Sequence, residues 1–132
     1  MLVREIRPGD LPLPAGASVT AHGLAIEAAG ALIAVGGLVR VGAHWWTFSD
    51  IKPEARNPVV LHRLVLGGLA AADRMGIARL YGYCDEAKPQ ARRWIEAIGF
   101  RLAGDDERDA SVRSVEEWCG SPAWIREAKR GD

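Results

Sequence analysis

Hydrophobic residues in the first part of the chain come in short runs separated by turn-forming residues. Residues 2–6 alternate in polarity and predict a short first strand, because alternation places apolar side chains on one face. Three longer apolar runs follow, and a pair of residues containing glycine separates each from the next. This spacing predicts an antiparallel meander with tight turns. The runs occupy residues 23–28, 31–41 and 44–51, with turns at Ala29-Gly30 and Gly42-Ala43.

Two details refine the predicted meander. The Pro-rich segment 11–18 is a connector that cannot hold a long helix. Gly36-Gly37, inside the second run, predicts a bulge or a close approach of two backbones. Trp45 and Trp46 are adjacent in a strand and therefore point to opposite faces, so we expect one of them in the core.

After residue 52 the apolar period becomes that of a helix. We predict a helix over residues 58–75, with Asn57 as its N-cap, Pro58 at its first position and Gly76 at its end. A strand over residues 78–84 follows. The apolar stripe of the helix comprises Leu61, Leu64, Val65, Leu69 and Ala72.

A second amphipathic segment predicts a helix over residues 89–98, ended by Gly99. Beyond it we expect a strand over 100–103, a charged loop at 104–111 and a last strand over 111–118. Ser121 as N-cap and Pro122 at the first position predict a short terminal helix. The predicted buried face of the second helix is Ala91, Trp94, Ile95 and Ile98.

Strands followed by alternating helices and strands predict an α/β (α+β) domain with a mixed sheet. The chain has 132 residues, the size of one domain, so we expect a single domain over 1–132 with its core at residues 2–104.

Charge and composition exclude several classes of function. Lysine plus arginine equals aspartate plus glutamate, 17 of each, so no overall field favours nucleic acid. No apolar run approaches the roughly 20 residues that cross a bilayer, and the N-terminus lacks the organisation of a signal peptide. With only two cysteines, Cys84 and Cys119, we expect thiols in a reducing, cytoplasmic setting and no membrane association. The three histidines are scattered, so no metal site is predicted.

Two segments resemble motifs of the GNAT superfamily of N-acetyltransferases. Residues 51–61, IKPEARNPVVL, are similar to the loop V-x-P-x-x-R-x-x-G-x-G, whose amides hold the pyrophosphate of acetyl-CoA in that family. Residues 88–100, KPQARRWIEAIGF, are similar to N-P-x-A-R-R-F-Y-E-x-L-G-F. The resemblance implies a mostly antiparallel twisted sheet of about six or seven strands flanked by helices. It also implies acetyl-CoA as cofactor, bound at Ile51, Arg56, Asn57, Val59, Val60 and Lys88.

The sequence departs from these motifs at the positions that bind and protonate CoA. Val59 and Leu61 replace the two loop glycines, which let the family's backbone approach the phosphates. Ile95 stands where many members carry a tyrosine that protonates the departing thiolate, and it cannot exchange a proton. Lys88 replaces an asparagine and offers a cationic ammonium instead.

Two residues are candidates for catalysis. Asp50, at the end of the fourth predicted strand, can accept a proton from an amine, although strand-end aspartates more commonly cap turns. Cys84, near the end of the fifth, can take an acyl group as a thiolate, although buried structural cysteines are more common. His62 lies at the start of the first helix, near any bound anion, and an exposed histidine without a role is the alternative.

Two functions follow from the resemblance and the departures. The first is a divergent acetyl-CoA-dependent N-acetyltransferase that acts on an unidentified amine of a small molecule or protein. The alternative is a GNAT-fold binding or structural protein that no longer binds CoA. Such a protein would form a homo-oligomer or bind to a partner in a larger particle. The second segment, with Tyr83-Cys84-Asp85 before it, also resembles GNAT-like proteins of phages and prophages, so the alternative includes association with a virion.

Overall fold

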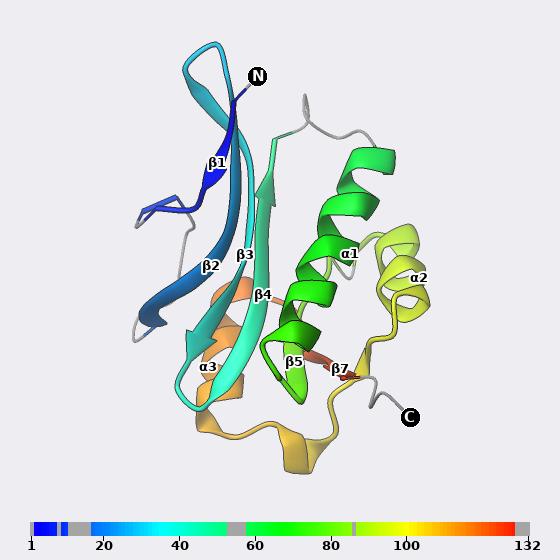
Figure 1. Ribbon diagram of the computed structural model, residues 1–132. Helices are drawn as coiled ribbons and strands as arrows, with labels where there is room; N and C mark the ends of the chain where they lie inside the picture. The colour runs from blue at the N-terminus through cyan, green and yellow to red at the C-terminus, as the bar shows by residue number, and fades with distance from the viewer. Residues whose placement is uncertain (1, 8, 11–16, 53–57, 86, 129–132) are drawn as a thin grey trace.

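The computed structural model describes residues 2–7, 9–10, 17–52, 58–85 and 87–128, and for a few of these only the backbone. It has a seven-stranded sheet with helices on both faces (Figure 1). In chain order the elements are β1 (Leu2–Glu5), β2 (Ala17–Ala28), β3 (Ala31–Val41), β4 (His44–Ile51), α1 (Pro58–Arg74), β5 (Arg79–Gly82), α2 (Pro89–Ala97), β6 (Arg101–Leu102), the 3-10 turn η2 (Asp105–Glu107), α3 (Ala110–Cys119) and β7 (Trp124–Glu127).

The strand order is β1-β2-β3-β4-β5-β7-β6, and all neighbours are antiparallel except β4 and β5. The predicted meander is therefore confirmed, as is the mixed, mostly antiparallel fold class. Its first tight turn places Ala29 and Gly30 at positive φ, 52° and 80°, which a turn between twisted strands requires. Gly42 takes φ 61° in the second turn.

Each face of the sheet carries one apolar core. We call the first the α3 face, because Val112 and Val115 of α3 pack there with Trp46 and Phe48 of β4. The second is the α1/α2 face, where α1 and α2 cover the sheet (Figure 1). Trp46 is fully buried on the α3 face and Trp45 packs on the α1/α2 face, as the alternation of a strand predicted. The α1/α2 core consists of Leu38, Leu69, Ala72, Ile77, Leu80, Ile95, Phe100 and Trp124.

The two predicted helices in the middle of the chain are confirmed. The structure begins α1 at Pro58 and ends it at Arg74, within one residue of the prediction. It places α2 at Pro89–Ala97, with Ile95 buried. One prediction on its buried face is wrong: Trp94 is 38% exposed, since it lies one position along the helix from Ile95 and so turns towards solvent.

The C-terminal predictions are wrong in both elements. Residues 111–118, predicted as a strand, belong to α3, and the segment after Ser121, predicted as a helix, forms β7. Ser121 caps no helix there, since its hydroxyl donates to the Pro122 carbonyl at 3.0 Å. Trp124 and Ile125 are both buried because β7 lies inside the sheet, between β5 and β6, with a core on each face.

The predicted connector is shorter than expected, because β2 begins at Ala17. Residues 11–16 lie outside the described part of the chain. At Gly36-Gly37 the ladder between β2 and β3 is regular, so the close approach holds and the bulge does not.

Candidate functional site

Among the described strands, β4 and β5 are the only parallel pair, and the sheet opens between them. The two strands pair at Trp45 with Leu80 and at Trp46 with Tyr81, and there the ladder stops. The backbone of β4 continues to Ile51, whereas β5 ends at Gly82. Beyond Thr47, the β4 backbone groups on this side therefore have no strand partner among the described residues. The Ser49 backbone donates a hydrogen bond to the Tyr83 hydroxyl at this edge. The remaining strand-edge N–H and C=O groups of β4 can bind an amide-containing ligand.

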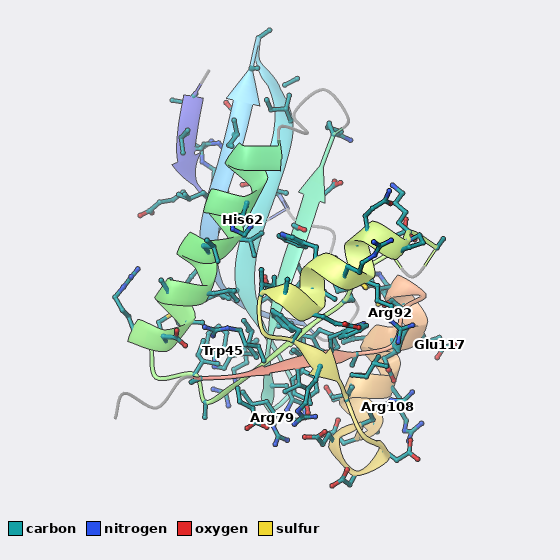
Figure 2. All side chains as sticks on the ribbon, turned by 90° about the vertical axis from the view of Figure 1, so that its right-hand side faces the viewer. Trp45, His62, Arg79, Arg92, Arg108 and Glu117 are labelled. Carbon is teal, nitrogen blue, oxygen red and sulfur yellow. The ribbon has the colours of Figure 1, made fainter. Side chains whose placement is uncertain are left out.

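A side-chain contact bridges the helices on the α1/α2 face. The indole N–H of Trp94 on α2 donates to Nδ1 of His62 on α1 at 3.3 Å. Figure 2 shows His62 on the side of α1 that faces α2. The His62 ring is exposed, as expected of a histidine without a role, but the hydrogen bond from Trp94 fixes its orientation. The proposed position of His62 near a bound anion stays a prediction.

Three aromatic rings gather on the α3 face at the opening. The ring of Phe48 on β4 lies 5.5 Å from that of Tyr83 and 5.8 Å from that of Trp118, which it meets edge to face. Tyr83 follows the end of β5, and Trp118 is on the last turn of α3. Phe48 is buried, Tyr83 is half-buried, and Trp118 is 42% exposed. The rings therefore form a wall that reaches from the core to solvent.

The environment of Tyr83 keeps its hydroxyl protonated. Burial raises the pKa of Tyr83 to about 12, the nearby Cys119 and Asp50 add to the rise, and a hydrogen bond from the Ser49 backbone opposes it. The hydroxyl of Tyr83 therefore lies at the edge of β4 that β5 leaves open, as a neutral hydrogen-bonding group.

The two predicted catalytic residues lie on opposite faces of the sheet. Asp50 pairs with Val35 and alternates with Phe48, which places its exposed side chain on the α3 face. Cys84 is half-buried against the α1/α2 core. The structure therefore brings Asp50, but not Cys84, together with the aromatic wall.

Of the predicted cofactor-binding residues, Lys88 is fully described. It is the N-cap of α2, without a side-chain cap, and its ammonium lies 3.9 Å from a carboxylate oxygen of Asp85. Arg56 and Asn57 lie outside the described residues. For Ile51, Val59 and Val60 the structure gives the backbone only: the end of β4 and the first turn of α1.

Sequence reasoning missed Trp118 and gave Tyr83 no role. Val112, Val115 and Trp118 are spaced by three, which is typical of one helical face, so the signal for α3 was present. Nothing in the sequence indicated that α3 would carry Trp118 to Phe48 and Tyr83, because Trp118 is 35 residues from Tyr83 along the chain.

Other polar clusters in the described residues have structural roles. His44 Nε2 lies 2.6 Å from Oδ2 of Asp109, which caps α3 through its other oxygen. An open hollow beside α3 is lined by Arg108 and Glu116, whose charges are already paired at 2.9 Å. No group of three or more potential metal ligands occurs among the described residues, and none of their helices is long and apolar enough to cross a membrane.

The fold is similar to that of solved acetyltransferases. A GNAT-family acetyltransferase from Staphylococcus aureus Mu50 matches with a TM-score of 0.64 at 14% identity, over 83% of this chain and 69% of that one. An IAA acetyltransferase from Bacillus cereus ATCC 14579 matches with 0.61 at 12% identity, over 96% and 98%. A GNAT-superfamily phosphinothricin acetyltransferase from Sinorhizobium meliloti, solved in complex with AcCoA, matches with 0.58 at 14% identity, over 84% and 63%.

At these identities the likeness shows the fold alone, and the chain spans less than two thirds of the Sinorhizobium enzyme. No protein-family model matches the sequence, and no curated protein matches it either.

Proposed function

We propose that this protein transfers an acetyl group from acetyl-CoA to an amine. The observation that carries the proposal is the opening between β4 and β5, whose ladder ends at Trp46 and Tyr81 while β4 runs on. The similarity in fold to an enzyme solved with AcCoA supports a thioester donor at this opening. The β4 backbone fits the donor chemically, since a CoA arm carries amides that pair with strand-edge groups.

The chain's own groups account for the reaction. A thioester carbonyl held at the opening can accept a hydrogen bond from a β4 amide, which stabilises the negative charge that develops on its oxygen. The acceptor nitrogen bonds to the carbonyl carbon, the carbon–sulfur bond breaks, and the sulfur leaves as a thiolate that takes a proton from solvent. Ile95 is buried and cannot supply that proton, so we expect modest rather than fast turnover.

Calorimetric titration with acetyl-CoA and with free CoA tests the proposal. We expect binding in the micromolar range, and product formation with an amine panel. Ser49 alternates with Phe48 and Asp50, so its exposed side chain points to the α1/α2 face beside the opening. Ser49→Trp should block the donor's path and abolish CoA binding, whereas the matched Ser49→Ala should bind as the native chain does.

If millimolar CoA produces no heat of binding and no rise in the melting temperature, the proposed acetyltransferase activity is ruled out. That result would favour the alternative of a binding or structural protein, including one associated with a virion. One observation supports that alternative: the edge strand β1 exposes Leu2 and Val3 by 54% and 56%, as an edge that pairs with a second copy would. Native mass spectrometry on the same sample then gives the oligomeric state.

A further inference from the structure

The two faces of the β4–β5 opening are covered differently. On the α1/α2 face, α1 and α2 lie over the sheet and the Trp94–His62 hydrogen bond joins them. On the α3 face, α3 ends at Cys119, and the side chains of Trp118 and Asp50 remain exposed. A second molecule that must reach the opening therefore has an approach on the α3 face.

The aromatic wall on that face is suited to an apolar or aromatic body. Trp118 presents an exposed ring whose orientation is fixed by its edge-to-face contact with Phe48. A fixed aromatic surface binds another flat or apolar group with little loss of conformational entropy. It also attracts a cation placed over its face.

Negative charge adjoins the aromatic wall. Asp50 lies close enough to Tyr83 for its charge to act on the phenol. Within the described part of the chain, the Asp50 carboxylate forms no hydrogen bond and no ion pair, unlike the carboxylates of Glu107, Glu116 and Asp109. An exposed carboxylate beside aromatic rings is complementary to an ammonium group carried on an apolar body.

We propose that the acceptor is a primary amine on an apolar or aromatic body, which rests on Trp118 and places its ammonium between Asp50 and Tyr83. The inference rests on the proposed acetyl transfer and names its substrate class. Asp50, directly or through water, takes the proton that the ammonium must lose before its nitrogen can attack. Tyr83 keeps its own proton and positions the amine at the β4 edge by a hydrogen bond.

Direct binding of amines tests the acceptor site without any donor present. Titration with phenethylamine and with spermidine compares an aromatic monoamine with a flexible polyamine. We expect phenethylamine to bind more tightly. Trp118→Ala should weaken its binding about three- to thirty-fold, which is the range of an aromatic or cation contact expressed as an affinity.

Two further variants separate recognition from folding. Trp118→Phe keeps an aromatic face and should retain most of the affinity, so a loss with alanine alone identifies the ring as the binding group. Trp94→Ala removes a tryptophan of similar exposure, 38%, from the other face and should leave phenethylamine binding as it is. Asp50→Asn should weaken amine binding and lower kcat/KM.

The outcomes distinguish this inference from the proposed function. If acetyl-CoA binds but Trp118→Ala binds phenethylamine as tightly as the native protein, or if spermidine is preferred, the acceptor class is wrong and acetyl transfer stands. If phenethylamine binds through Trp118 and Asp50 but CoA does not, the amine site stands as a binding site and acetyl transfer fails.

Discussion

Gly23 lies in the middle of β2 and faces Gly37 of β3. A Cβ atom added to Gly23 would lie 2.6 Å from the Cα of Gly37, and closer still to the carbonyl oxygen of Gly36. Real Cβ atoms do not approach backbone this closely, so the two strands pack at a distance that only glycine allows. The sequence predicted a close approach at Gly36-Gly37, but not that Gly23 is its other side.

Gly23→Ala should therefore destabilise the fold. The strands must move apart, and overpacking of this kind lowers the free energy of unfolding by about 1–3 kcal/mol. Gly67→Ala is the matched control, because its Cβ meets no atom within 4 Å and α1 should gain about 0.5–1 kcal/mol of helix propensity. Urea titration of both variants measures the difference. Equal stability of Gly23→Ala and the native chain would show that the two strands can separate at no cost.

Among single elements, α3 determines the most about the site. This helix, which lies between β6 and β7 in the chain, covers one face of the sheet and brings Trp118 to the opening. Asp109 starts the helix, since its Oδ1 accepts a hydrogen bond from the Val112 N–H at 2.9 Å. Gly120 ends it at φ 71°, a left-handed conformation that suits glycine. Clear caps at both ends explain why the segment is a helix and not the predicted strand.

Asp109→Ala should lower the free energy of unfolding by about 1 kcal/mol, because the cap is lost. Asp109→Asn keeps a capping oxygen and should cost less. The hydrogen bond from His44 lowers the pKa of Asp109 below its ordinary 3.8, so the charged cap stabilises above that pH and loses its contribution as the pH falls further. The urea midpoints of unfolding at pH 6 and pH 3 measure both effects. An Asp109→Ala variant as stable as the native chain would show that the cap does not stabilise the fold.

For the whole molecule, an ion-pair network ties together the short strands at the end of the sheet. Glu107 accepts two hydrogen bonds from Arg101, at 2.7 and 2.8 Å, and Arg79 lies 3.2 Å from it. Arg101 also contacts Glu127 of β7 at 2.8 Å. Figure 2 shows Arg79 in the lower part of the molecule, below His62. The network therefore joins β5, β6 and β7 to η2.

Because of this network, the free energy of unfolding should decrease as the pH is lowered. The hydrogen bonds from Arg101, and then that from the Gly104 N–H, lower the pKa of Glu107 from 4.5 to about 2. A lowered carboxyl pKa stabilises the fold fully above pH 4.5, and that stability is lost as the pH falls towards 2. Glu107→Gln should flatten this part of the curve of unfolding free energy against pH, measured by urea titration.

Glu117→Gln is the control, since Glu117 is exposed on α3 and forms no ion pair with a described residue. Its curve should follow that of the native chain. If Glu107→Gln and Glu117→Gln gave the same curve, the acid sensitivity would arise elsewhere, with Asp10 beside Arg4 as the next candidate.

Much of the fold was predictable because it depends on local patterns. Turn glycines separated the strands of the meander, and apolar spacing located α1 and α2 within one residue at each end. The C-terminal segment was not predictable in the same way. Ser121-Pro122 is typical of a helix start, but Trp124 and Ile125 gain more by burial on both faces of a central strand. Tertiary burial overrode the local signal there.

The sequence by itself determined the elements as far as β6 and placed the candidate residue Asp50 at the end of β4, because the end of an alternating strand can be read from neighbours along the chain. Only the tertiary structure decided that Asp50 shares a face with Tyr83 and Trp118 while Cys84 lies on the other. Faces are set by strand register and by the helix that crosses them, and both depend on contacts between residues far apart in sequence. The proposed acceptor site depends on such contacts, because β4, the end of β5 and α3 form it together.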